Sequence, residues 1–368
     1  MRFPEFSGEW KMCTIGELIT KVGSCVTPRG GEAVYKTEGH PFVRSQNVGL
    51  GNLLLDDIAF IDEETHLRQK NTELQFNDVL LNITGASIGR SALVDKQIVG
   101  GNVNQHVCII RTKENLVPSF ICSFLLSNYG QRQIDSFQAG GNRQGLNFEQ
   151  IKSIKITIPS KDEQIKIAKL LRAIDERIAT QNKIIEKLQS LIKGIAQNVA
   201  RNNKPNIRLS ECLECSSSTL QESDVCKNGT YPVYGANGIV GYLDNYNTEK
   251  EAVYIIKDGS GVGTVSYVTG KCSATGTLNT LQAKEGYSLQ YLYYMLKVFN
   301  FEPYKTGMAI PHIYFKDYGK AKIFCPSYTE QLKYARLLSA IDNKLSAEQS
   351  ILTDLSLQKQ YLLRQMFI

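Results

Sequence analysis

The sequence predicts an α+β fold in which two domains of mixed α/β type are separated by two long antiparallel coiled-coil helices, with a pseudo-two-fold internal repeat. Three observations predict it. Two twenty-residue segments, 159–178 and 326–345, are identical at eleven positions, which indicates a duplication. Each segment begins a long stretch of good helix formers. Each also follows a region of short apolar runs broken by Gly, Asn, Asp and Pro, which is typical of strands and turns.

The repeat divides the chain into four predicted parts. A first domain spans 1–157, a central helix 158–204, a second domain 205–325 and a C-terminal helix 326–368. The polar string NNKPN, which contains a proline, separates the two halves, as expected for a boundary.

Shorter landmarks recur in the same order in both domains. TGASIG at 84–89 corresponds to DGSGVG at 258–263, and each follows an apolar run, VLLNI or VYIIK. The helix-like strings FICSFLL and YLYYMLK come later in each half. We therefore expect one scaffold used twice, with a tight turn at each glycine-containing string.

Both long helices carry an apolar seam. Apolar positions alternate in steps of three and four from Ile167 to Val199 and from Tyr334 to Met366, which predicts a coiled coil. A helix of about 38 residues is about 57 Å long and cannot bury its seam alone, so we expect the two helices to pack against each other. Ser160 with Glu163 three residues later predicts a capping box at the first helix start.

Polar residues interrupt the seams at equivalent places, Gln181 in the first helix and Glu348 in the second. One interpretation is that a polar seam group sets the register of the helices. The other is that both side chains reach solvent where the helices splay. The outer face of the first helix is basic, and it is either a solvated face or a docking surface for other subunits. Its residues are Lys166, Lys169, Arg172 and Arg177.

Composition indicates a folded protein with a mild basic excess. Hydrophobic residues make up 42% and charged residues 21%, and the net charge is +6, which is compatible with an acidic partner such as nucleic acid. No apolar run of membrane-spanning length occurs and the first residues do not resemble a signal peptide, so we expect a cytoplasmic protein with no membrane partner.

The nine cysteines are scattered, and we expect reduced thiols packed as small apolar side chains. Cys212 and Cys215 have C-x-x-C spacing. No second ligand pair follows at zinc-site spacing, so no metal is expected, and a redox pair is the alternative.

Motifs for common catalytic sites are absent from the sequence. It contains no G-x-x-x-x-G-K-[ST], H-E-x-x-H or N-P-P-[YF] string. We therefore predict a binding protein that has no catalytic residue and binds no cofactor of its own.

The repeated string P-x-x-x-E-Q, the turns ITGASIGR and KDGSGVGT, and the phrase YPVYGANGIVGY resemble the specificity subunits of type I restriction-modification systems. The order of segments is similar over essentially the whole chain. The resemblance implies that each domain is a target-recognition domain for one half of a split, asymmetric site in double-stranded DNA. It implies that the helices set the gap between the halves and dock two methyltransferase subunits.

The resemblance also implies partners that carry the chemistry. An adenine methyltransferase subunit would use S-adenosylmethionine, and a restriction and translocase subunit would use ATP and magnesium to cut unmodified DNA in host defence. Two other hypotheses remain: a stand-alone nuclease or methyltransferase with fused recognition domains, and a module that holds protein partners.

Candidate DNA-contacting residues are polar side chains in loops, because base edges are read by paired hydrogen bonds. His106 lies beside an apolar strand, and packing in the core is its alternative role. GGNRQG and GMAIPH lie at mirrored positions, so we expect both loops to face the same way. In the first domain the candidates are Arg44, Gln46, Asn47, Asn82, Ser87, Arg90, Asn104, Gln105, His106, Asn142, Arg143 and Gln144. In the second domain they are Tyr234, Asn237, Lys257, Ser260, Thr277, Asn279 and His312.

Overall fold

The computed structural model describes residues 2–26, 28, 34–138, 145–307 and 310–367. The chain forms two compact units. The first contains residues 1–181 and 351–368, and the second contains residues 182–350. Each unit therefore combines one predicted domain with part of each long helix.

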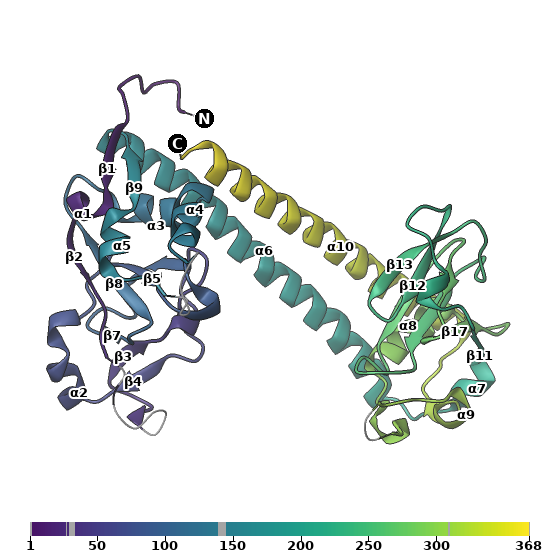
Figure 1. The fold of residues 1–368 in the computed structure, drawn as a ribbon. Helices are drawn as coiled ribbons and strands as arrows, with labels where there is room; N and C mark the ends of the chain where they lie inside the picture. Colours follow the sequence, from purple (N-terminus) through teal and green to yellow (C-terminus); the bar gives the residue numbers. More distant parts are fainter. Residues whose placement is uncertain (1, 27, 29–33, 139–144, 308–309, 368) are drawn as a thin grey trace. The chain divides into compact units, whose positions relative to one another are not determined.

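The described residues of the first unit form three sheets (Figure 1). The four-stranded sheet has the order β2 (Ile19–Gly23), β8 (Val107–Thr112), β5 (Val79–Asn82) and β6 (Ser91–Leu93). The three-stranded sheet has the order β4 (Ala59–Ile61), β3 (His40–Val43) and β7 (Asn102–Val103), and only its β3–β7 pair is parallel. The third sheet pairs β1 (Lys11–Thr14) with β9 (Lys155–Ile158). The helices are α1 (Ile15–Leu18), α2 (Glu63–Arg68), α3 (Pro118–Leu126), α4 (Asn128–Ser136) and α5 (Phe148–Ser153).

The second unit repeats this topology strand for strand. Its four-stranded sheet has the order β11 (Leu213–Ser217), β17 (Leu278–Ala283), β14 (Ala252–Ile256) and β15 (Val265–Val268). Its three-stranded sheet has the order β13 (Gly238–Leu243), β12 (Tyr231–Gly235) and β16 (Ser273–Ala274), and β12 and β16 are parallel. A third sheet pairs β10 (Ile207–Arg208) with β18 (Lys322–Ile323). The helices are α7 (Leu209–Cys212), α8 (Leu289–Val298) and α9 (Phe315–Tyr318). The predicted duplication is confirmed.

Short 3-10 helices complete the connections. They are η2 (Ser45–Asn47), η3 (Lys70–Thr72), η4 (Gly85–Ser87), η5 (Glu222–Asp224) and η6 (Glu302–Tyr304).

The two glycine-containing strings are tight turns, as predicted. Gly85 and Gly89 have φ of 72° and 84°, and Gly259 and Gly263 have φ of 93° and 90°, a region that favours glycine. The second glycine of each turn is also in close contact. A Cβ on Gly89 would lie 2.7 Å from the Gln131 side chain, and one on Gly263 would lie 3.0 Å from the Phe301 side chain. The first glycine of each turn has open space around it.

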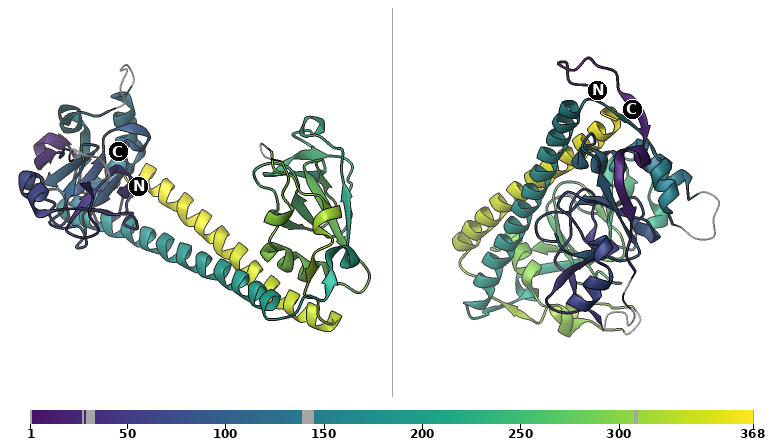
Figure 2. Two further views of the ribbon diagram at one scale, coloured as in Figure 1. Left: turned by 90° about the horizontal axis from the view of Figure 1, so that it is seen from below. Right: turned by 90° about the vertical axis from the view of Figure 1, so that its left-hand side faces the viewer.

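The long helices are α6 (Lys161–Arg201) and α10 (Tyr328–Gln365). None of the twenty predicted seam positions is exposed, so the period of three and four is confirmed. In the first unit, Lys359 Nζ lies 2.5 Å from Asp175 Oδ1, and Met366 and Phe367 pack in one core cluster with Ile167 of α6. The two chain segments therefore run in opposite directions there, and Figure 2 shows the end of α10 beside the first turns of α6.

The polar seam residues do not reach solvent. Gln181 is 8% exposed and Glu348 is 6% exposed, and Lys344 forms an ion pair with Glu348. The interpretation in which both side chains are solvated at a splay is therefore wrong, and the register role stays a prediction. Ser160 Oγ accepts from Glu163 N at 3.4 Å, which is one of the two contacts of the predicted capping box. The buried Glu163 carboxylate accepts two hydrogen bonds at 2.8 Å from Arg2.

A buried glutamine ties each long helix to its own unit. Gln164 Oε1 accepts from Val117 N at 2.9 Å, at the N-cap of α3. Gln331, its counterpart in the repeat, accepts from Ser288 N at 2.9 Å, at the N-cap of α8. The Gln of the repeated string P-x-x-x-E-Q therefore links two helix starts in both halves.

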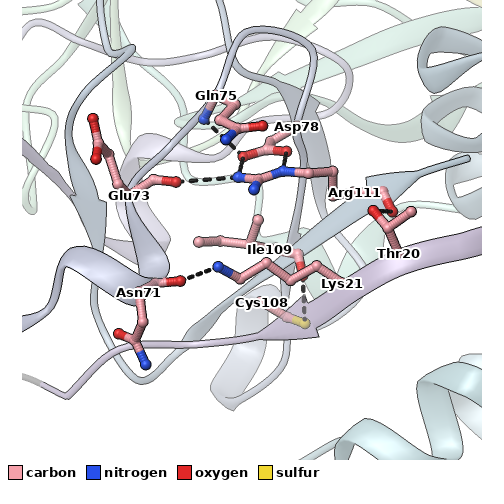
Figure 3. Close-up of polar contacts among 9 residues, drawn as sticks. All are labelled: Thr20, Lys21, Asn71, Glu73, Gln75, Asp78, Cys108, Ile109 and Arg111. Atoms are coloured by element: carbon pink, nitrogen blue, oxygen red, sulfur yellow. Dashed lines mark hydrogen bonds and ion pairs between the residues drawn. The ribbon is translucent and has the colours of Figure 1, made fainter.

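An ion pair with a buried carboxylate links β8 to the residue that precedes β5 in the first unit (Figure 3). Arg111 on β8 donates from Nε and Nη2 to the two carboxylate oxygens of Asp78, each at 2.7 Å, and Asp78 is 1% exposed. Arg111 also donates to Glu73 O at 3.1 Å. Because every contact is internal, this pair stabilises the sheet and offers no free charge.

All nine cysteines are free thiols. Burial raises the pKa of Cys212 to about 12 and that of Cys215 to about 11, which is the opposite of what a reactive thiol needs. The raised pKa values therefore do not favour the redox interpretation of this pair, which stays a hypothesis. In the part of the chain that the structure describes, no cluster of three or more His, Cys, Asp or Glu could hold a metal. Within the same described ranges, no helix combines the length and hydropathy of a membrane span.

Candidate nucleic-acid interface

The predicted loops of the first unit meet where β5 ends and β8 begins. Ile83 N donates to His106 O at 3.0 Å, and Leu146 N donates to Ile83 O at 2.8 Å. The Asn82 side chain donates from Nδ2 to Ser45 O at 2.8 Å. Three of the four predicted loops are therefore in contact, and the residue that follows the fourth lies beside them.

The second unit gathers its loops in the same way. Lys257 N donates to Thr277 O at 3.0 Å, and Gly259 N donates to Pro311 O at 3.0 Å. Thr275 N donates to Tyr234 O at 2.9 Å. All four predicted loops of this domain thus converge at the equivalent end of its four-stranded sheet.

Three candidates in the first unit converge on one carboxylate, that of Asp57. Arg44 Nη2 lies 3.3 Å from Asp57 Oδ2 and 2.6 Å from its main-chain oxygen. Gln46 Nε2 donates to Oδ2, and Asn47 Nδ2 donates to Oδ1 at 2.8 Å. The guanidinium carbon of Arg44 lies 5.4 Å from the Tyr35 ring centroid.

The turn of the first unit places further candidates together. His106 is half-buried rather than packed in the core, and its Nδ1 lies 2.5 Å from Thr84 Oγ1. Gln105 is exposed, with Nε2 3.0 Å from His106 Nε2. Ser87 Oγ accepts from Asn82 Nδ2 at 3.1 Å. Arg90 is exposed at the end of the turn, so its guanidinium is open to an incoming ligand.

In the second unit, a histidine and a carboxylate lie at the turn. His312 Nδ1 is 2.6 Å from Asp258 Oδ1, and both side chains are 35% exposed. Asn237 and Ser260 are exposed, whereas Lys257 is half-buried.

Two more candidates of this unit mainly support its loops. Thr277 Oγ1 lies 2.9 Å from Thr275 Oγ1. The Tyr234 ring centroid lies 5.7 Å from that of Tyr254, and burial raises the pKa of Tyr234, so its hydroxyl stays neutral.

Several candidates serve the fold instead of offering a free side chain. Asn47, Asn82, Asn104 and Asn279 are all less than 9% exposed. Asn279 Oδ1 accepts from Ser217 at 2.8 Å, and Asn104 Oδ1 accepts from His106 N at 3.1 Å. These amides hold the loops in place. The candidates Asn142, Arg143 and Gln144 lie outside the described residues.

The basic residues on the outer face of α6 are exposed. Lys166 forms an ion pair with Glu5 and lies 4.6 Å from the Phe3 ring centroid, so the N-terminal segment covers part of its side chain. Arg172 bonds to Glu176 at 2.9 Å one turn along the helix. Lys169 and Arg177 are exposed as well.

Sequence reasoning missed the residues that orient these loops. Thr84 and Asp258 both precede the first glycine of a turn, and each contacts a histidine. The alignment of the two turns was a signal that could have identified them. Asp57 has no such signal, because its three partners lie 10 to 13 residues earlier in the chain.

Two regions of the chain, residues 7–190 and 205–356, match the family model described as the type I restriction modification DNA specificity domain. The chain belongs to this family. Proteins of the family are the specificity subunits of type I restriction enzymes, whose catalytic activities lie in other subunits. This agrees with the resemblance that the repeated motif indicated.

Relatives named as specificity subunits align with much or part of the chain. A putative type I specificity subunit of Mycoplasma genitalium is 25% identical over 320 residues, which cover 79% of this chain and 81% of that protein. The putative MjaX specificity subunit of Methanocaldococcus jannaschii is 21% identical over 199 residues, 53% of this chain and 46% of that one. The EcoprrI specificity subunit of Escherichia coli is 28% identical over 112 residues, 30% of this chain and 28% of that one.

Solved structures share the fold over the full length. The crystal structure of a type I restriction-modification S subunit from M. genitalium matches with a TM-score of 0.69 and 19% identity, covering 100% of this chain and 99% of that one. A second match, from a study of complex assembly and conformational transition of the type I R-M system, has a TM-score of 0.56 and 15% identity, covering 98% and 97%. The specificity-subunit fold is therefore present in both halves.

Proposed function

We propose that this chain binds double-stranded DNA and reads a bipartite, asymmetric site, one half through the loops of each unit. One observation carries the proposal: the two units repeat one topology, while the side chains at equivalent loop positions differ. A common scaffold with different loop chemistry is suited to two related reading tasks that are not identical.

The loop after β3 and β12 illustrates this difference. Val43 O accepts from Asn104 N at 3.0 Å, and Tyr234 O accepts from Thr275 N at 2.9 Å, so Val43 and Tyr234 are equivalent. The following residues read Arg-Ser-Gln in the first unit and Gly-Ala-Asn in the second. The third residue is thus an exposed carboxamide in each unit, Gln46 or Asn237, a group that can pair with the N6 and N7 atoms of adenine.

The long helices would act as a spacer that sets the gap between the half-sites, and also as the docking surface for two methyltransferase subunits. A rigid spacer fits half-sites about one helical turn apart on one face of the duplex. The exposed Lys169 and Arg177 support docking, because both side chains remain available on the outer face of α6. A structural relative comes from a study of assembly in such a system.

Under this proposal the chain itself binds no cofactor. S-adenosylmethionine belongs to the methyltransferase subunits, and ATP and magnesium belong to a restriction and translocase subunit. The chain selects the DNA site at which those subunits act.

The decisive experiment is co-expression with the cognate methyltransferase subunit, followed by mapping of methylated adenines across a genome. We expect one split motif with a constant gap. Replacing residues 1–157 with the equivalent part of a relative should change one half of the motif only. A motif without a gap, or a swap that changes both halves, would contradict the proposal that each unit reads one half of the site.

A second measurement tests the division of labour. The purified chain alone should transfer no methyl group from labelled S-adenosylmethionine to DNA, and it should not cut DNA with ATP and magnesium present. Activity of the isolated chain in either assay would favour the fused-enzyme hypothesis.

A further inference from the structure

One carboxylate in the first unit organises a group of hydrogen-bond donors. Asp57 accepts from Arg44 Nη2 and Gln46 Nε2 on Oδ2, and from Asn47 Nδ2 on Oδ1. The carboxylate side chain is 56% exposed, while that of Arg44 is 18% exposed. In this cluster, the side chains of Asp57 and Gln46 are therefore exposed to solvent, whereas that of Arg44 is mostly covered.

Arg44 is held on more than one side. Its guanidinium carbon is 5.4 Å from the Tyr35 ring centroid, and Nη2 also donates to Asp57 O at 2.6 Å. Its Nε is buried and has no hydrogen-bond partner among the described residues. Arg44 thus has little freedom to reorient, and it fixes the position of the carboxylate that it contacts.

Gln46, unlike Arg44, has a side chain that is open to solvent. It is exposed, and its contact with Asp57 engages one N–H of the carboxamide. The other N–H and Oε1 are the pair of groups that a glutamine uses to contact adenine N7 and N6. A carboxylate that has already oriented this long side chain reduces the conformational entropy that binding must remove.

Within the described residues of the second unit, no carboxylate orients the carboxamide at the equivalent position. Arg44 and Ser45 correspond to Gly235 and Ala236, and within the described residues no carboxylate contacts the exposed Asn237. The shorter Asn side chain also has fewer rotamers to restrict. The Asp57 cluster is therefore a feature by which the two units differ.

We propose that Asp57 is a positioning residue that holds Gln46 in the orientation for base contact and so sets the base preference at one position of the first half-site. This inference rests on the proposed function, because it assigns a role within the reading loops of the first unit. It predicts that loss of Asp57 relaxes one base position without affecting the second half-site.

The test uses the complex with methyltransferase subunits and genome-wide methylation mapping. Asp57→Ala and Gln46→Ala should both lower discrimination at the same single base position by at least about fivefold, the smaller effect expected for a paired base contact. Asp57→Glu should restore part of the preference. Asp56→Asn is the matched control, since Asp56 is an exposed neighbouring carboxylate, and it should leave the motif unchanged.

The outcomes separate this inference from the proposed function. If the wild-type complex shows no split motif, the proposed function fails. If the wild type shows it and Asp57→Ala keeps the full preference, the Asp57 inference is overturned while the proposed function stands. Should Asp57→Ala prevent assembly, Asp57→Ser decides: relaxation at the base position that Gln46→Ala relaxes supports the inference, and an unchanged motif overturns it.

Discussion

Replacement of Gln164 by alanine should loosen the junction between α6 and the first unit. The side chain is 1% exposed and makes three hydrogen bonds, accepting from Val117 N at 2.9 Å and donating to Asn115 O and Pro159 O at 3.1 Å each. Truncation leaves a main-chain N–H without its partner and two carbonyls without their donor. The orphaned N–H costs about 1–3 kcal/mol and each lost carbonyl contact about 0.5 kcal/mol, so we expect a loss of about 2–4 kcal/mol for the site.

The chain's single tryptophan provides an assay specific to this unit. Trp10 lies 6.4 Å from the Phe120 ring centroid on α3, the helix whose start Gln164 contacts. Tryptophan fluorescence during heating therefore reports this region. A loss of 2–4 kcal/mol corresponds to about 4–16 °C in Tm for a unit of this size.

The repeat supplies the matched control. Gln331→Ala removes the equivalent contact in the second unit, where Gln331 Oε1 accepts from Ser288 N, so it should shift the Trp10 transition much less. Gln164→Glu keeps the acceptor and should fall between wild type and alanine. The reasoning would be refuted if Gln164→Ala left the transition within about 1 °C of wild type, or if Gln331→Ala lowered it equally.

Four further predictions follow from the structure. Gly85→Ala should lower the free energy of unfolding by about 1–2 kcal/mol from the positive φ alone. Gly89→Ala should lower it by about 1–3 kcal/mol more, because the new Cβ would displace the hydrogen-bonded Gln131 side chain. Equal losses for the two variants in urea unfolding would contradict this expectation. Arg111→Ala should lose about 3–5 kcal/mol by leaving a buried carboxylate unpaired, and a loss below 1 kcal/mol would show that the pair contributes little. The hydrogen bond from His40 lowers the pKa of the Glu63 carboxyl. The stabilisation by this hydrogen bond should therefore be complete above the ordinary Glu pKa of about 4.3 and disappear as the pH falls through the lowered pKa. A Glu63→Gln variant with the same acid-unfolding curve as wild type would disprove this pH dependence. Four residues inserted after Gln181 add about 6 Å of helix, and methylation mapping should show a changed gap or no activity but unchanged base preferences; an unchanged gap at full activity would remove the spacer role.

Much of the fold could be predicted because its signals are local or repeated. The seam positions follow the helical period, and an apolar residue every three or four positions is visible in the sequence itself. The turn at 84–89 is visible because its glycines allow positive φ, and its match at 258–263 indicates the second copy. The order of strands in the sheets was not predicted, since pairing partners lie far apart in the chain.

The candidate site shows where sequence reasoning stops. Polar loop residues were identified by type, and the structure does bring their loops together. It also buries Asn82, which bonds to Ser45, and Asn279, which bonds to Ser217 at the end of β11, whereas Gln46 and Asn237 remain exposed. Residue type alone cannot distinguish these fates, because an amide that supports a loop and an amide that contacts a ligand have the same chemistry.

The sequence by itself determined that the chain is a duplication, that each half ends in a long seamed helix, and that the glycine turns recur. These properties depend on spacing along the chain, which a sequence records directly. Only the tertiary structure decided that Gln164 and Gln331 bond to helix starts across their units, and that Asp57 gathers Arg44 and Gln46. Those contacts depend on which distant backbone atoms folding brings within hydrogen-bond distance, and no local pattern of residues encodes that distance.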